Sequence, residues 1–85
     1  MRIQILGSGC KKCDELYARA RQAAERIKWD EPPLVEKVDD IDVFLQHGVR
    51  VTPALVVAGE LVSSGQLLEV EQIEQAIRER LAANG

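Results

Sequence analysis

The feature that most constrains this fold is a short apolar run, followed by a glycine-rich turn and a long stretch free of glycine and proline. Arg2 to Leu6 has the composition of a strand, and Gly7 and Gly9 follow it. A helix is predicted over Lys11 to Trp29, and Asp30-Glu31-Pro32-Pro33 ends it because proline cannot continue a helix. The apolar face of this helix consists of Leu16, Ala20, Ala23, Ala24 and Ile27.

The next segment predicts a second strand and a short second helix. The apolar side chains of the strand are Leu34, Val35 and Val38. Residues 39–46 predict the helix, with Asp39 or Asp40 as its N-cap, because an aspartate side chain can accept hydrogen bonds from the free N–H groups of the first turn. We expect three side chains of this helix to face inward: Ile41, Phe44 and Leu45.

The C-terminal part predicts a hairpin and a last helix. Ala54 to Val57 and Leu61 to Ser63 are apolar strands, and Ala58-Gly59 between them is short enough for a hairpin turn. The last helix is predicted from about Val70 to Ala82, and Asn84-Gly85 would end it. Its apolar side is formed by Ile73, Ala76, Ile77 and Leu81.

The predicted order β-α-β-α-β-β-α indicates an α/β fold. A β-α-β start joins two parallel strands through a right-handed crossover, and the hairpin adds an antiparallel edge. We therefore expect a mixed four-stranded sheet with helices packed on both faces, an α/β sandwich. A length of 85 residues suits one domain, so residues 1–85 are expected to form a single domain.

Charge and hydropathy limit the expected partners. The formal net charge is −3 and no lysine or arginine block is present, which argues against binding to nucleic acid. No apolar stretch is long enough to cross a membrane, and the first residues do not resemble a signal peptide. We expect a cytoplasmic protein, in a compartment where structural disulfides are rare.

Both cysteines of the chain lie in the stretch GSGCKKC. Cys10 is predicted at or just before the first helical residue, and Cys13 one turn further along. A helix N-terminus carries free N–H groups and a partial positive charge, which favour a thiolate. Lys11 and Lys12 are expected to favour the Cys10 thiolate further, and Gly9 to leave room for a substrate chain.

Three kinds of chemistry are open to this pair. The Cys10 thiolate could attack a substrate disulfide and Cys13 could resolve the mixed disulfide, as in dithiol exchange. The two thiolates could instead bind or deliver a metal, but structural zinc usually takes four ligands, and the only other soft ligands are His47 and Met1. The cysteines could also be two small buried apolar residues.

The CxxC at a helix start, together with Val51-Thr52-Pro53-Ala54 before an apolar strand, resembles the thioredoxin superfamily. The similarity is greatest to the small thioredoxin-like redox-active disulfide proteins. It covers nearly the whole chain, including ILGSGCKKC, VEKVDDIDVFLQHGVRVTPALVVAGELVSSG and the closing helix.

The resemblance implies a thiol–disulfide oxidoreductase. Its substrates would be protein disulfides, an upstream reductase would restore it, and the redox-active Cys10–Cys13 disulfide would replace any cofactor. The resemblance also implies that the Thr52–Pro53 peptide bond is cis and lies beside the CxxC. The backbone of Thr52 would then pair with an extended substrate segment.

The sequence departs from the family pattern at three places. Thioredoxins carry Trp-Cys-Gly-Pro-Cys, whereas Gly9 precedes Cys10 here and Lys11-Lys12 separate the two cysteines. Thioredoxins carry a buried aspartate on the strand before the CxxC, whereas Gln4 stands here and cannot act as a base; Lys37 is a possible local charge. The acidic pair that glutaredoxins place after a glycine-rich turn is missing after Ser63-Ser64-Gly65, which argues against glutathione as a partner. A non-catalytic adaptor with the same fold is a further alternative.

Overall fold

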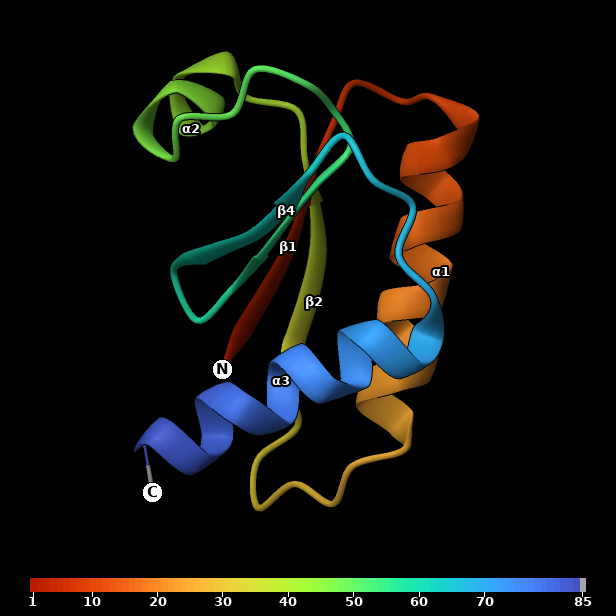
Figure 1. The fold of residues 1–85 in the computed structure, drawn as a ribbon, viewed down its shortest axis with the longest axis vertical. Helices are drawn as coiled ribbons and strands as arrows, with labels where there is room; N and C mark the ends of the chain where they lie inside the picture. Colours follow the sequence, from red (N-terminus) through yellow and green to blue (C-terminus); the bar gives the residue numbers. More distant parts are fainter. Residues whose placement is uncertain (85) are drawn as a thin grey trace.

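The computed structural model describes residues 1–84, and its elements follow the predicted order (Figure 1). Four strands form one sheet in the order β2-β1-β3-β4, with β1 and β2 parallel and the other two pairings antiparallel. The predicted mixed four-stranded sheet is therefore confirmed. The elements are β1 Arg2–Leu6, α1 Lys11–Glu25, β2 Leu34–Val38, α2 Ile41–Gln46, β3 Ala54–Val57, β4 Glu60–Ser64 and α3 Val70–Asn84.

Two buried apolar clusters lie on opposite faces of the sheet. Along β1, Ile3 and Ile5 point into the larger cluster and Leu6 into the smaller, because side chains alternate along a strand. The larger cluster includes the predicted apolar faces of α1 and α3, and the smaller one packs against α2. Helices thus cover both faces, as predicted. No helix within residues 1–84 is both long and apolar enough to cross a bilayer.

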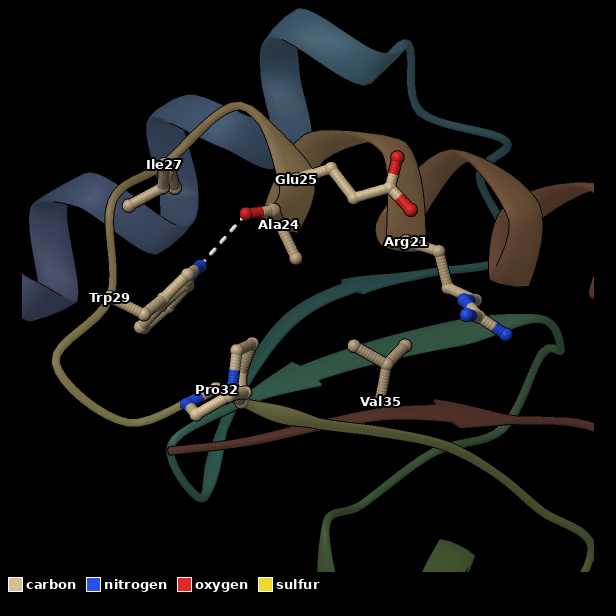
Figure 2. A pocket seen from close by; sticks show the side chains of 8 residues that line it. Arg21, Ala24, Glu25, Ile27, Trp29, Pro32 and Val35 are labelled. Carbon is tan, nitrogen blue, oxygen red and sulfur yellow. Dashed lines mark hydrogen bonds between the residues drawn. The ribbon is translucent and has the colours of Figure 1, made fainter.

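Helix α1 ends earlier than predicted. It ends at Glu25, with Arg26 as the C-cap, whereas the sequence predicted a helix to Trp29. The last turn closes with three-residue bonds, in which the Arg26 N–H donates to the Ala23 carbonyl and the Ile27 N–H to the Ala24 carbonyl, both at 3.2 Å, and the chain then turns back before the prolines. The indole N–H of Trp29 also donates to the Ala24 carbonyl oxygen, at 2.8 Å (Figure 2).

Helix α2 has the predicted cap but not the predicted orientation. Asp40 is the N-cap, and its side chain accepts a hydrogen bond from the Asp42 N–H at 2.9 Å. Ile41 and Leu45 are 68% and 71% exposed, so the expectation that they face inward was wrong. At about 100° per residue, Val43 lies about 160° round the helix from both Ile41 and Leu45, and Phe44 lies between Val43 and Ile41. Its inward side chains are accordingly Val43 and Phe44.

The C-terminal elements extend slightly beyond their predicted bounds. The hairpin turn is the predicted one, and both Ala58 (φ 53°) and Gly59 (φ 82°) have the positive φ that a two-residue turn of this kind requires. Strand β4 is one residue longer at each end than predicted, and α3 continues through Asn84. The predicted helix end at Gly85 lies outside the described residues.

Candidate active site

The termini of all four strands meet at one end of the sheet, and the predicted site residues lie in the loops there. Leu6 pairs with both Val38 and Ala54, and Ala54 pairs with Ser64. β1, β2 and β4 therefore end where β3 begins. The loop that carries Cys10 and the loop that carries Thr52 meet at this edge (Figure 1).

Cys10 is the N-cap of α1, as the sequence predicted. Its backbone is extended (φ −84°, ψ 163°), and its Sγ accepts a hydrogen bond from the Cys13 N–H at 3.2 Å. The sulfur thus takes the place of the serine or aspartate oxygen that usually caps a helix. Cys10 is exposed, Cys13 is only 2% exposed, and both thiols are free.

The two thiols shift each other's pKa in opposite directions. The pKa of Cys10 is lowered chiefly by a hydrogen bond from the Cys13 side chain, and then by the backbone N–H groups of Cys13 and Lys12. The pKa of Cys13 is raised first by burial, and then by its hydrogen bond to Cys10 and the Cys10 charge. The first negative charge on this coupled pair therefore resides on the exposed sulfur. A role for the ammonium groups of Lys11 and Lys12 in tuning the thiolate stays a prediction.

Gly7 packs directly against the buried thiol. A Cβ at this position would lie 2.3 Å from the Sγ of Cys13 and 3.9 Å from the Cβ of Thr52. The position is also fixed by a backbone hydrogen bond, in which the Gly7 N–H donates to the Val38 carbonyl oxygen at 3.0 Å. The sequence indicated a turn at Gly7. The sequence did not indicate that Gly7 lies between Cys13 and Thr52, because this position depends on packing between distant segments.

We expect Gly7→Ala to disturb the site more than Gly9→Ala. The new methyl group at Gly7 would displace the Cys13 sulfur, so we expect a loss of roughly 1–3 kcal/mol in the free energy of unfolding. Gly9 has φ 75° and open space around it, so alanine there costs only backbone strain, about 1 kcal/mol.

Urea denaturation of both variants measures this difference, and the rate at which Cys13 resolves a mixed disulfide should fall only in Gly7→Ala. Equal losses and equal rates in the two variants would show that Gly7 does not position Cys13.

Thr52 presents an open length of backbone beside Cys13. The Thr52–Pro53 peptide bond is cis. On either side the loop is anchored, since the Val51 carbonyl accepts from the Ser64 hydroxyl at 2.7 Å and the Pro53 carbonyl accepts from the Gly65 N–H at 2.8 Å. Within residues 1–84, no hydrogen bond engages the N–H or the carbonyl of Thr52.

A hollow of about 260 Å³ lies beside the buried thiol. Lys37 lines it from β2, where it is the register partner of Ile5 and so shares the face that carries α1. Its Nζ lies 3.0 Å from Oδ1 of Asp14 and 5.2 Å from the ring centre of Tyr17. The residues around the hollow are Ile5, Gly7, Gly9, Cys13, Lys37 and Asp39.

Lys37 is the site residue whose position the sequence did not define. Strand alternation was the available signal, but only the register between β1 and β2 places Lys37 at the hollow that Cys13 also lines. Gln4 lies on the other face of β1, where its amide donates to Oε1 of Glu36 at 3.0 Å. Gln4 therefore does not face the thiols. The charged residues that line the hollow are Lys37, which is paired with Asp14, and Asp39.

The second hollow of the structure lies apart from the cysteines, and the described residues form no cluster of metal ligands. A larger hollow, of about 400 Å³, sits between the second half of α1 and Val35, near the opposite end of the sheet (Figure 2). In the described part of the chain, no three His, Cys, Asp or Glu side chains lie close enough together to hold a metal ion. The metal alternative thus gains no ligand there beyond the two thiols.

Comparison with known proteins identifies the family. Residues 1–78 match the family model of the thioredoxin domain. The chain belongs to the thioredoxin domain family. This thioredoxin domain is 35% identical over 77 residues to a thioredoxin of Methanothermobacter thermautotrophicus, a match that covers 91% of this chain and 97% of the relative. It is 30% identical over 79 residues to a thioredoxin of Methanocaldococcus jannaschii, covering 93% and 88% of the two chains.

Family membership and paired cysteines together give the coarse function. A thioredoxin domain with Cys10 and Cys13 one turn apart has a thioredoxin-like redox role, that of an oxidoreductase in general terms. The metal-delivery and adaptor alternatives have no comparable support.

Proposed function

We propose that this thioredoxin domain reduces disulfides in proteins, with Cys10 as the attacking thiol and Cys13 as the resolving thiol. One observation carries the proposal: the exposed sulfur of Cys10 caps α1, has a lowered pKa and accepts hydrogen bonds from the buried Cys13. The exposed sulfur can reach another molecule, and the buried one can reach only Cys10. The reaction needs no cofactor beyond these two thiols.

Reduction would occur in two exchange steps. The Cys10 thiolate attacks one sulfur of the substrate disulfide, a Cys10–substrate disulfide forms, and the other substrate sulfur leaves as a thiolate. Cys13 then loses its proton and attacks the Cys10 sulfur, which releases the second substrate thiol. Two electrons pass from the dithiol to the substrate, and a Cys10–Cys13 disulfide remains for an upstream reductase.

The pKa shifts support this order of events. The Cys10 charge is one of the causes that raise the pKa of Cys13. Formation of the mixed disulfide removes that charge, so the Cys13 thiol becomes easier to deprotonate at the step that needs it. Before that step, the protonated Cys13 stabilises the attacking thiolate by donating a hydrogen bond.

The open backbone of Thr52 would hold the substrate segment. Its free N–H and carbonyl can pair with an extended chain in the manner of strand addition, and Gly9 leaves room beside Cys10 because nothing lies within 4 Å of its Cβ position. We assign the reaction to the cytoplasm, where protein thiols are kept reduced, and to a single domain formed by the whole chain.

A Cys13→Ser variant tests the assignment of the two thiols. Incubated in its reduced form with native insulin, whose disulfides are intact, it should accumulate a mixed disulfide through Cys10, because the resolving thiol is absent. Non-reducing mass spectrometry measures the adduct, and dithiothreitol should reverse it. The double variant Cys10→Ser/Cys13→Ser is the control and should form none. A stable adduct with Cys10→Ser but not with Cys13→Ser would contradict the assigned roles.

A further inference from the structure

Three cationic side chains on the two segments that carry Cys10 and Thr52 form no ion pair within residues 1–84. All three are exposed, and none takes part in an ion pair, unlike Lys37, which is bound to Asp14. The formal net charge of the whole chain is −3, so this local positive charge runs against the overall balance. The three residues are Lys11, Lys12 and Arg50.

The three cations come from the two segments that border the proposed substrate path. Lys11 and Lys12 form the start of α1, immediately after Cys10. Arg50 precedes Thr52 by two residues in the loop before β3. The side chains of Thr52 and Cys13 both lie within 4 Å of a Cβ position at Gly7, so the two loops are in close proximity.

The nearby carboxylates lie away from this path or are occupied. Asp14 is paired with Lys37 at 3.0 Å, and Asp40 caps α2 by accepting from the Asp42 N–H at 2.9 Å. Asp39 follows β2, which lies on the opposite side of β1 from β3 in the sheet order. Within the described residues, no ion pair neutralises the charges of Lys11, Lys12 and Arg50 on the segments that carry Cys10 and Thr52.

We propose that this site prefers disulfides whose flanking residues are acidic. The inference rests on the proposed function and names its substrate class: extended protein segments with aspartate or glutamate beside the reactive cysteine. A segment laid along Thr52 would place such side chains near Arg50 and the two lysines. Attraction between opposite charges raises the encounter rate and weakens as salt screens it.

Two peptides that differ only in charge provide the test. Each carries one cysteine as a mixed disulfide with 2-thiopyridine, flanked by four glutamates in one peptide and four lysines in the other. The Cys10 thiolate attacks the peptide sulfur and expels pyridine-2-thione, whose absorbance reports the rate. Cys13 then attacks Cys10, releasing the peptide thiol and leaving the Cys10–Cys13 disulfide.

At low ionic strength we expect the glutamate peptide to react about tenfold faster than the lysine peptide. The ratio should fall to about twofold in roughly 0.5 M salt. In the triple variant Lys11→Gln/Lys12→Gln/Arg50→Gln it should approach one. A ratio cancels any change in the Cys10 thiolate fraction, because that change slows both peptides alike.

The matched control is Arg2→Gln/Arg21→Gln/Lys28→Gln, which removes the same charge away from the site. It should retain the wild-type ratio. Equal rates for the two peptides with the wild type would overturn the preference for acidic substrates. So would an unchanged ratio in the first triple variant. Neither outcome would contradict the proposed function. If neither peptide reacts faster with the wild type than with Cys10→Ser, the proposed function and the preference both fail.

Discussion

Replacing Cys10 with serine should reduce the rate of insulin reduction about a thousandfold or more. A serine hydroxyl stays protonated near neutral pH and cannot form a disulfide, so the first exchange step has no nucleophile. The insulin turbidity assay with dithiothreitol as donor measures the loss. Cys13→Ser serves as the comparison, because it should still complete the first step once per molecule. Substantial turnover by Cys10→Ser would rule out the assigned nucleophile.

The pH dependence of Cys10 alkylation should reveal its thiolate. Only the thiolate reacts with iodoacetamide, and the pKa of Cys10 is lowered, so the rate should reach half its maximum at a lower pH than in the urea-unfolded chain. Cys13→Ala removes the hydrogen bond that contributes most to this shift, and the midpoint should move up. A midpoint unchanged by Cys13→Ala would mean that Cys13 does not stabilise the thiolate.

The largest expected loss of stability comes from Leu16→Ala. Leu16 is fully buried in the cluster between α1 and the sheet, and truncation leaves a cavity as well as losing buried apolar area. We expect the free energy of unfolding to fall by about 2–5 kcal/mol. Since a chain of this length has roughly 4–13 kcal/mol in total, a large share of the variant could unfold at ordinary temperature.

Urea denaturation at 25 °C would measure this change, and Gln22→Ala is its control. Gln22 lies on the exposed side of the same helix, so its truncation should change the free energy of unfolding by less than about 0.5 kcal/mol. Similar losses in the two variants would contradict the burial of Leu16 and with it the packing of α1 on the sheet.

Local pattern predicted most of this fold and the place of Cys10 at the start of α1. The apolar faces of α1 and α3 follow from three- and four-residue spacing, and the Cys10 cap follows from a strand, a glycine turn and a helix in succession. The remaining details required contacts that no local pattern encodes. Trp29 lies beyond the end of α1 and donates back to a carbonyl five residues earlier, and Val43 takes the inward position expected for Leu45.

The surroundings of the buried thiol depended on long-range pairing. Lys37 reaches the Cys13 side only because β2 pairs with β1 in one particular register, and a shift of one residue would turn it to the other face. Gly7 contacts Cys13 only because α1 packs closely over the end of β1. Residue types indicated the chemistry, whereas the order of the strands and their register determined which neighbours the thiols have.

The cap formed by Cys10 has a consequence for how such a chain can change. Serine is among the best capping residues, so Cys10→Ser would abolish electron transfer while its hydroxyl accepts the same Cys13 N–H and keeps the start of α1 intact. Loss of the reaction and loss of the folded scaffold are therefore separable at this position. For the reaction proposed here, a single substitution would remove the attacking thiol and leave a stable domain with nearly the same surface.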